Sequence, residues 1–190
     1  MKTLIKTLFA FIFIVFISSC NSTEEQKTNT NSKKETTETS KKQGQAFLRD
    51  DEGTPNVLQI AIGSPDHKTL VAAVQAAELE NALVNAGPLM VFAPTDTAFG
   101  LLPDGTVEDL VKPENKNVLA NILKYHVTPG NYSKEFLKEF KKLGQANNQD
   151  VLVEVKGDDV YVGGAKIIGS VKAGNGIVHV IDKVMLPPTK

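Results

Sequence analysis

"VFAPTDTAFGLLP", residues 91–103, begins with an apolar run typical of a strand and continues with a pattern typical of a short helix, and this change indicates the fold class. Leu89 to Ala93 is a short apolar run of strand length, and the Pro-Thr-Asp sequence that follows ends it. Thr95 or Asp96 can then cap a helical turn, because short oxygen-bearing side chains accept hydrogen bonds from the first free backbone N–H groups of a helix. A buried strand that leads directly into a short helix is therefore expected.

Further helices are predicted on both sides of this stretch. Residues 63–66 read GSPD, in which a capping serine and a proline at the first helical position are typical of a helix start. The apolar spacing of residues 70–84 predicts a helix pair, which Gly87-Pro88 ends. Downstream, Thr106 begins another short helix, and residues 115–125 form a longer one.

The apolar period changes to two after residue 144. Residues 151–155 alternate as a strand, and residues 160–162 and 166–168 are two more strand candidates. Asn175-Gly176 is a dipeptide favoured in tight hairpins, and residues 177–181 follow it as a further strand. Because helices come first and most strands come later, the pattern predicts an α+β domain and not a parallel βαβ array.

The N-terminal residues have the pattern of an export signal. Residues 1–19 begin with two lysines, continue through an apolar run too short to span a bilayer, and end on small residues. Ile17-Ser18-Ser19-Cys20 resembles the bacterial lipobox, in which the cysteine is lipidated and becomes the first residue. Residues 1–19 are thus predicted to be a lipoprotein signal peptide. The alternative is an ordinary signal peptide beside a single free thiol.

Residues 20–46 are predicted to be the lipidated cysteine and a disordered tether. Between Asn21 and Ala46 only the final alanine is apolar, so the segment cannot offset its ordering entropy by burial. Glu24-Glu25 resembles acidic signals that export lipoproteins to the cell surface, or it is simply two solvated charges. The expected location is the bacterial cell envelope, lipid-anchored in the outer membrane, with surface exposure as a hypothesis.

Charge argues against nucleic acid as a partner. The chain carries 21 basic and 22 acidic residues, and losing residues 1–19 with their two lysines leaves a net charge of −3. Arg49 is the only arginine. A mildly acidic chain with one guanidinium and no basic cluster in its folded part is a poor match for phosphate recognition.

Three segments together resemble the fasciclin (FAS1) domain family: VFAPTDTAFGLLP (91–103), PENKNVLANILKYHVTPG (113–130) and GNGIVHVIDKVMLPP (174–188). They match in order and spacing, and the resemblance spans roughly residues 55–188 of a predicted domain at 47–190. It implies an α+β FAS1 fold, an orthogonally packed β-sandwich or wedge covered by several short α-helices. It also implies a secreted or membrane-anchored, non-enzymatic protein associated with adhesion and matrix interaction.

Tyr125-His126 lies where animal members of the family carry a Tyr-His motif implicated in adhesion. From the residues alone, Val118, Ile122 and His126 are spaced by four, which puts His126 on an apolar helix face and favours packing over direct contact. His179 alternates with apolar neighbours on a strand and is interpreted as structural, at a position where the family also has a histidine. His67 is expected to be exposed.

The sequence contains few residues suited to metal binding or catalysis. The chain has three histidines without ligand spacing and one cysteine assigned to lipidation, so neither a metal site nor a cofactor is expected. No nucleophile elbow is present, and Ser64 or Ser170 near a histidine would be coincidence. Where integrin-binding members carry Asp-Ile, this chain has Ser170-Val171, so integrin recognition is not carried over.

The sequence thus predicts an envelope-anchored, non-catalytic FAS1 lipoprotein that mediates cell adhesion or protein or matrix interaction. Its partner is an unidentified protein or matrix component, and its contact with the membrane is through Cys20. The alternative is an envelope carrier for an apolar small molecule, carotenoid-like or lipid-like, since some relatives bind carotenoids. Such a site would be an apolar cleft with few polar groups.

Overall fold

A computed structural model of the chain describes residues 53–85 and 87–188. They belong to the second of two units into which the chain divides, Lys41–Lys190. The predicted signal peptide, the lipidation at Cys20 and the tether lie outside the described residues, and they stay predictions.

Residues 53–85 and 87–188 form seven short α-helices and one 3-10 turn, most of them before the main group of strands. The helices are α1 (Val57–Gly63), α2 (Lys68–Ala76), α3 (Glu80–Asn85), α4 (Asp96–Phe99), α5 (Thr106–Leu110), α6 (Lys116–Tyr125) and α7 (Lys134–Leu137), with η2 at Pro113–Asn115. Thr95 caps α4 as predicted, because its hydroxyl oxygen accepts a hydrogen bond from the N–H of Ala98 at 3.2 Å. The longer helix predicted for residues 115–125 is confirmed as α6.

The strands form one mixed sheet of seven. They are β1 (Leu89–Pro94), β2 (Val127–Pro129), β3 (Lys142–Gly144), β4 (Asp150–Lys156), β5 (Asp159–Val162), β6 (Ala165–Ala173) and β7 (Gly176–Ile181). Their order is β2-β1-β7-β6-β5-β4-β3, and only β1 and β7 pair in parallel. β1 is buried along its whole length, as expected for a strand covered on both faces.

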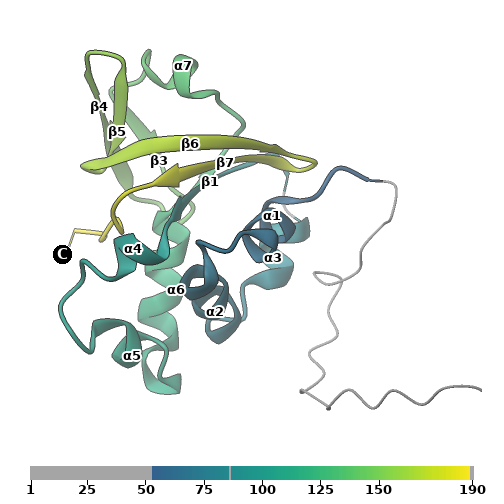
Figure 1. The fold of residues 1–190 in the computed structure, drawn as a ribbon, viewed down its shortest axis with the longest axis vertical. Helices are drawn as coiled ribbons and strands as arrows, with labels where there is room; N and C mark the ends of the chain where they lie inside the picture. The colour runs from purple at the N-terminus through teal and green to yellow at the C-terminus, as the bar shows by residue number, and fades with distance from the viewer. Residues whose placement is uncertain (1–52, 86, 189–190) are drawn as a thin grey trace, which may run out of the picture. The chain divides into compact units, whose positions relative to one another are not determined.

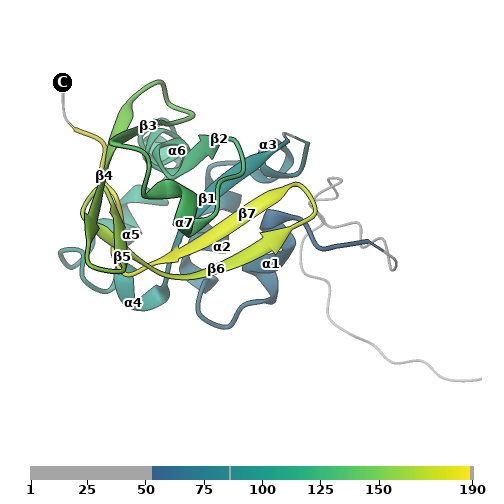
Figure 2. The same cartoon turned by 90° about the horizontal axis from the view of Figure 1, so that it is seen from above.

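Two apolar cores lie on opposite faces of the β1–β7 pair. In Figure 1 helices α1 to α6 lie below β6 and β7, whereas α7 and the β4–β5 hairpin lie above them. Figure 2 shows the same layers from above, with α7 in front of the strands. The helix-side core includes Leu58, Val74 and Val178. The core under α7 and the hairpin includes Phe92 and Ile181. Helices on one face and crossing strands on the other confirm the predicted α+β wedge.

The two edge strands of the sheet approach each other. The N–H of Ala146 donates to the carbonyl of Val127 at 2.7 Å, and the side-chain amide of Gln145 is hydrogen-bonded to the hydroxyl of Thr128 at 3.0 Å. Thr128 and Gln145 are both buried, so this polar contact is shielded from water. The sheet is therefore nearly closed, and it offers few unpaired edge groups.

Some predicted boundaries are wrong. The GSPD stretch does not begin α2: Ser64 lies at the C-terminal end of α1, and α2 begins at Lys68. The strand predicted for residues 166–168 continues to Ala173, because a register shift between Ile167 and Gly169 interrupts the alternation without ending the pairing. Five elements were not predicted at all: α1, η2, α7, β2 and β3.

Candidate functional site

Tyr125 lies at the end of α6 and is buried in the core under α7. The residue is 6% exposed, and its hydroxyl donates to the carbonyl of Asp150 at 3.4 Å. Burial, and then the nearby Asp150 carboxylate, raise the pKa of the Tyr125 hydroxyl. The side chain therefore joins α6 to the start of β4, and little of it faces solvent.

His126 follows directly and is 3% exposed. Its Nδ1 lies 2.8 Å from the carbonyl oxygen of Ile122, and the backbone N–H of Met185 donates to its Nε2 at 3.0 Å. Because a carbonyl can only accept, Nδ1 carries the proton and Nε2 is the acceptor. Both ring nitrogens are thus used inside the domain, and the ring is held in the neutral form.

This environment strongly disfavours the charged ring. Burial lowers the pKa of His126 to about 4, and the hydrogen bond to Ile122 opposes that shift only in part. A second ring proton would sit on Nε2 and point at the N–H of Met185, so two donors would face each other. His126 is therefore uncharged across the physiological pH range.

Two of the three residues predicted for the apolar face of α6, Ile122 and His126, are buried as expected, and Val118 is not. Val118 is 53% exposed, whereas Leu119, Ile122 and Leu123 are buried with His126. These buried positions follow the i, i+3, i+4, i+7 spacing of one helix face, and Val118 lies one position away from it. The predicted face is therefore correct at Ile122 and His126, and its first residue is Leu119 instead of Val118.

His179 lies fully buried on β7. Its Nε2 donates to the carbonyl of Tyr132 at 2.9 Å, and its Nδ1 lies 2.7 Å from the hydroxyl oxygen of Ser170 on the neighbouring strand β6. The ring stacks on Phe92 with centroids 5.7 Å apart. Burial lowers the pKa of His179, an effect that the hydrogen bond to Tyr132 partly opposes. His179 thus ties the segment before α7 to the sheet.

His67 was expected to be exposed and is buried, with 6% of its surface accessible. It occupies the N-cap position of α2, where the chain turns back against α4, and its Nδ1 lies 2.7 Å from the hydroxyl of Ser64. Nε2 of this ring is buried and has no hydrogen-bond partner within the described part of the chain. Ser64 and Ser170 are therefore both paired with a histidine.

An apolar cleft of about 190 Å³ opens between the helices and the sheet. Its walls come from α1, α2, α3, the end of α6, and strands β1 and β7. Of the residues that line it, only Lys124 and His126 are not apolar. His126 contributes its ring to the wall, while both of its nitrogens are used by the backbone. A ligand that enters the cleft meets hydrocarbon almost everywhere.

The sequence did not locate this cleft. Its lining residues run from Val57 to Val178 and meet only because the fold brings α1 and β7 together. Residues 53–85 and 87–188 contain no group of three or more His, Cys, Asp or Glu side chains that could hold a metal ion. No helix among them is long and apolar enough to cross a membrane.

A comparison with known protein families identifies the domain that contains the buried histidines and the apolar cleft. Residues 65–187 match the family model described as the fasciclin domain. The chain belongs to the fasciclin domain family. Its strand-to-helix stretch, its Tyr125-His126 segment and its last strand all lie inside the matched region, so the resemblance drawn from those segments is confirmed.

Relatives of this fasciclin domain occur in several bacteria. Protein sll1483 of Synechocystis is 43% identical over 155 residues, which are 81% of this chain and 84% of that relative. The cell surface glycolipoprotein MPB83 of Mycobacterium bovis is 36% identical over 108 residues, which are 56% of this chain and 47% of the relative.

Solved structures share the fold. A FAS1 domain pair from the insect cell adhesion molecule fasciclin I matches with a TM-score of 0.62 at 18% sequence identity, over 70% of this chain. The chain spans about half of that pair, 51% of its length. At this identity the match shows the fold alone, and it confirms the FAS1 fold class.

Proposed function

We propose that this chain is a non-catalytic interaction module of the bacterial cell envelope, which mediates adhesion by binding a protein or matrix partner. The observation that carries the proposal is its membership of the fasciclin domain family, whose fold is also that of an insect cell adhesion molecule. Fold alone does not fix function, so the surface partner must be found by experiment.

Lipid anchoring is part of the proposal. The lipobox-like sequence that ends in Cys20 supports it, and so does a relative that is named a cell surface glycolipoprotein. Acyl chains contribute about 0.8 kcal/mol for each methylene group buried in the bilayer, so a multiply acylated Cys20 would hold the chain firmly. The polar stretch from residue 21 to 46 would then act as a spacer between the membrane and the domain.

The buried histidines support a non-catalytic role. Ser170 and His179 are 2.7 Å apart, but the other ring nitrogen of His179 donates to a neutral carbonyl. That carbonyl is neutral, unlike the carboxylate that orients the histidine of a catalytic triad, and the Glu135 carboxylate only partly opposes the effect of burial on the pKa of His179. Burial also lowers the pKa of His179, so the ring is a weak base.

Adhesion is tested by bead retention on live cells of the producing strain. Beads coated with residues 41–190 should stay on the cells in larger numbers than beads coated with the same chain after heat unfolding. Equal retention of the two bead sets would remove adhesion to sister cells as a function. A thermal melt of the coating protein before immobilisation shows that the first bead set carries folded domain.

A second candidate function is the carriage of an apolar small molecule. The cleft of about 190 Å³, with a wall that is apolar except for Lys124 and His126, favours it. Chain purified from its native host should then carry an extractable organic compound, detectable by mass spectrometry or by visible absorbance. A native preparation that yields no compound above the level of a heat-unfolded control would count against a carrier.

A further inference from the structure

We propose that the cleft binds a single-chain amphiphile, whose short alkyl segment fills the apolar wall and whose anionic head group pairs with Lys124. This inference rests on the second candidate function and specifies its ligand class. Three properties of the cleft carry it: its volume, the absence of free polar groups in its wall, and the charge at its mouth.

The volume limits the buried part of the ligand. A cleft of about 190 Å³ is only slightly larger than the ~150 Å³ protein cavity known to hold benzene, so it accommodates roughly eight carbon atoms. A carotenoid-sized molecule would leave most of its length in water. A straight alkyl chain can instead place one short segment inside and extend through the open side.

The wall requires that segment to be hydrocarbon. Leu58, Val74 and Val178 are buried residues of the helix-side core and form part of the lining. His126 is the one polar side chain in the wall that is itself buried, and its two nitrogens are already bound to Ile122 and Met185. A polar group placed in the cleft would therefore lose its hydrogen bonds to water without replacement.

The opening of the cleft carries a positive charge, in contrast to its apolar wall. Lys124 is exposed, lies in the last turn of α6, and is the one charged residue of the lining. Within the described part of the chain, no hydrogen bond or ion pair engages its ammonium group. An ammonium at the edge of an apolar cleft can keep its charge in water and meet an anionic head group there, while the attached chain lies inside.

Small residues flank this opening. Ala82 on α3 and Ala146 in the turn before β4 are exposed and line the cleft. A larger side chain at either position would cover the opening without entering either core. Ala82→Phe is therefore a variant that blocks the cleft and should leave the fold intact.

The first test measures how affinity depends on chain length. Residues 41–190, checked for a cooperative thermal melt, are titrated calorimetrically with hexanoate, octanoate, decanoate and dodecanoate. Each methylene that enters the cleft should tighten binding about fourfold. The gain should end near eight to ten carbons, when the cleft is full. A steady gain through twelve carbons would overturn the size limit.

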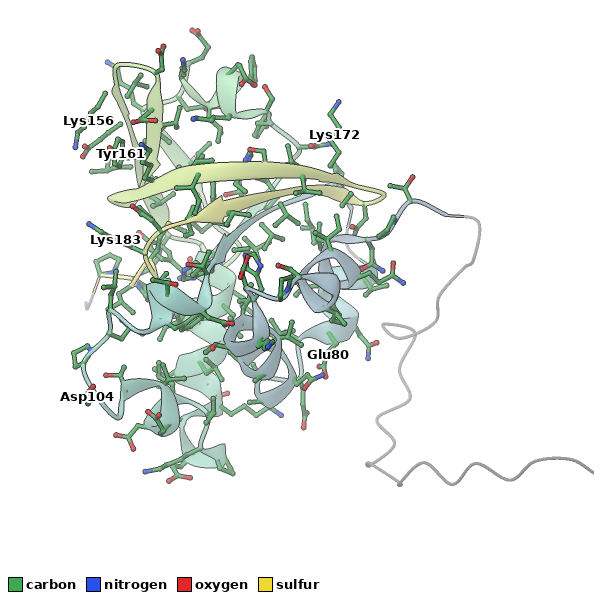
Figure 3. The ribbon with its side chains drawn as sticks, in the orientation of Figure 1. Glu80, Asp104, Lys156, Tyr161, Lys172 and Lys183 are labelled. Atoms are coloured by element: carbon green, nitrogen blue, oxygen red, sulfur yellow. The ribbon has the colours of Figure 1, made fainter. Side chains whose placement is uncertain are left out.

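The second test separates the head group from the chain. Lys124→Met keeps most of the side-chain length and removes the charge, so it should weaken decanoate and decyl phosphate about fivefold at low salt and leave decanol unchanged. Lys172→Met is the matched control, because Figure 3 shows Lys172 on β6, on the other side of the β6–β7 layer from α1 to α3. A preference for decanoate or for decyl phosphate distinguishes a fatty acid from a lysophospholipid type of head group.

The outcomes distinguish this inference from the function on which it rests. Decanol and decanoate that bind equally, insensitive to Lys124→Met but blocked by Ala82→Phe, would keep the apolar carrier and refute the anionic head group. Binding that Ala82→Phe does not change would refute the cleft as the site. No heat of binding for any of the probes at either of two well-separated temperatures, in a chain that melts cooperatively, would refute the carrier itself, because apolar burial changes the heat capacity and cannot be silent at both.

Discussion

At the scale of single residues, the ring of His126 connects two segments that are far apart in the sequence. Its two partners are backbone groups of opposite kind. The carbonyl of Ile122 in α6 accepts a hydrogen bond from the ring, and the N–H of Met185 after β7 donates one to it. Neutral histidine is the side chain that offers one donor and one acceptor in a rigid ring. The Tyr-His pair is therefore held inside the domain, and any effect on a partner would pass through the position of α6.

Acid should destabilise the domain through this ring. The pKa of His126 is about 4 in the folded state and 6.5 in the unfolded chain, so below pH 6.5 the unfolded chain binds the proton more readily. The stability that the neutral ring confers is complete above pH 6.5 and is lost as the pH falls to about 4. Between pH 7.5 and pH 4 the loss should be about 3 kcal/mol.

Urea unfolding at the two pH values measures this loss. Other groups titrate in the same window, among them His179, whose pKa is also lowered. His126→Asn is the control, because it cannot titrate and leaves the other groups in place. The wild-type chain should lose about 3 kcal/mol more than the variant. Equal losses in both chains would show that His126 does not carry the pH dependence.

Replacing the ring with a methyl group should lower the unfolding temperature. His126→Ala leaves the carbonyl of Ile122 and the N–H of Met185 without their partner, and each unsatisfied buried group costs about 1–3 kcal/mol. A thermal melt followed by circular dichroism gives the change. An unchanged melt together with lost retention on cells would instead make His126 a direct contact to the partner.

At the scale of elements, β1 and β7 lie so close at one point that only glycine fits. A Cβ on Gly176 would lie 1.8 Å from the carbonyl oxygen of Leu89, its partner across the parallel pair. The backbone of β1 cannot move away easily, because the strand is buried on both faces. The dipeptide Asn175-Gly176 was predicted only as a turn, whereas Gly176 also permits the pairing of the two central strands.

Gly176→Ala should therefore destabilise the domain by at least about 3 kcal/mol, through overpacking against the backbone. Gly63→Ala is the matched control, since a Cβ at Gly63, at the end of α1, would have nothing within 4 Å. Chemical unfolding of the three chains compares them. Similar stabilities for both variants would contradict the close approach.

The elements that sequence patterns predicted are those with strong periodicity or a clear cap, such as β1, β4 and α6. Helix α1 was missed although Asn56 and Gln59 form a capping box there, a pattern that could have revealed it. Strands β2 and β3 have three residues each, too few for an alternation to be recognised. They form because β2 pairs with β1 and β3 pairs with β4. These pairings depend on the tertiary fold and are not visible in the local sequence.

At the scale of the whole molecule, sequence motifs predicted the family and the fold class, but not the cleft. The cleft depends on how α1, α3 and the end of α6 pack against β1, and no local pattern records that arrangement. The burial of His67 has the same origin, since it follows from the packing of α2 against α4. Features formed by distant segments were thus found only from the structure.

Lipid anchoring at Cys20 should decide whether the whole protein stays with the membrane. Replacing Cys20 by serine removes the thiol that would be acylated, so the variant should leave the membrane fraction and lose the mass of the acyl chains. Membrane fractionation of the producing strain and mass spectrometry of the purified chain measure the two effects. A Cys20→Ser chain that stays in the membrane fraction would refute lipid anchoring at this residue.

Whether the chain acts as an envelope-anchored adhesion module is measured by counting producing cells retained under flow on a layer of sister cells. The strains compared are the wild type, a deletion of the gene, and the deletion complemented with either the native chain or the Cys20→Ser chain. The wild type and the native complement should be retained in larger numbers than the other two strains. Retention of the deletion strain at the wild-type level would contradict that role.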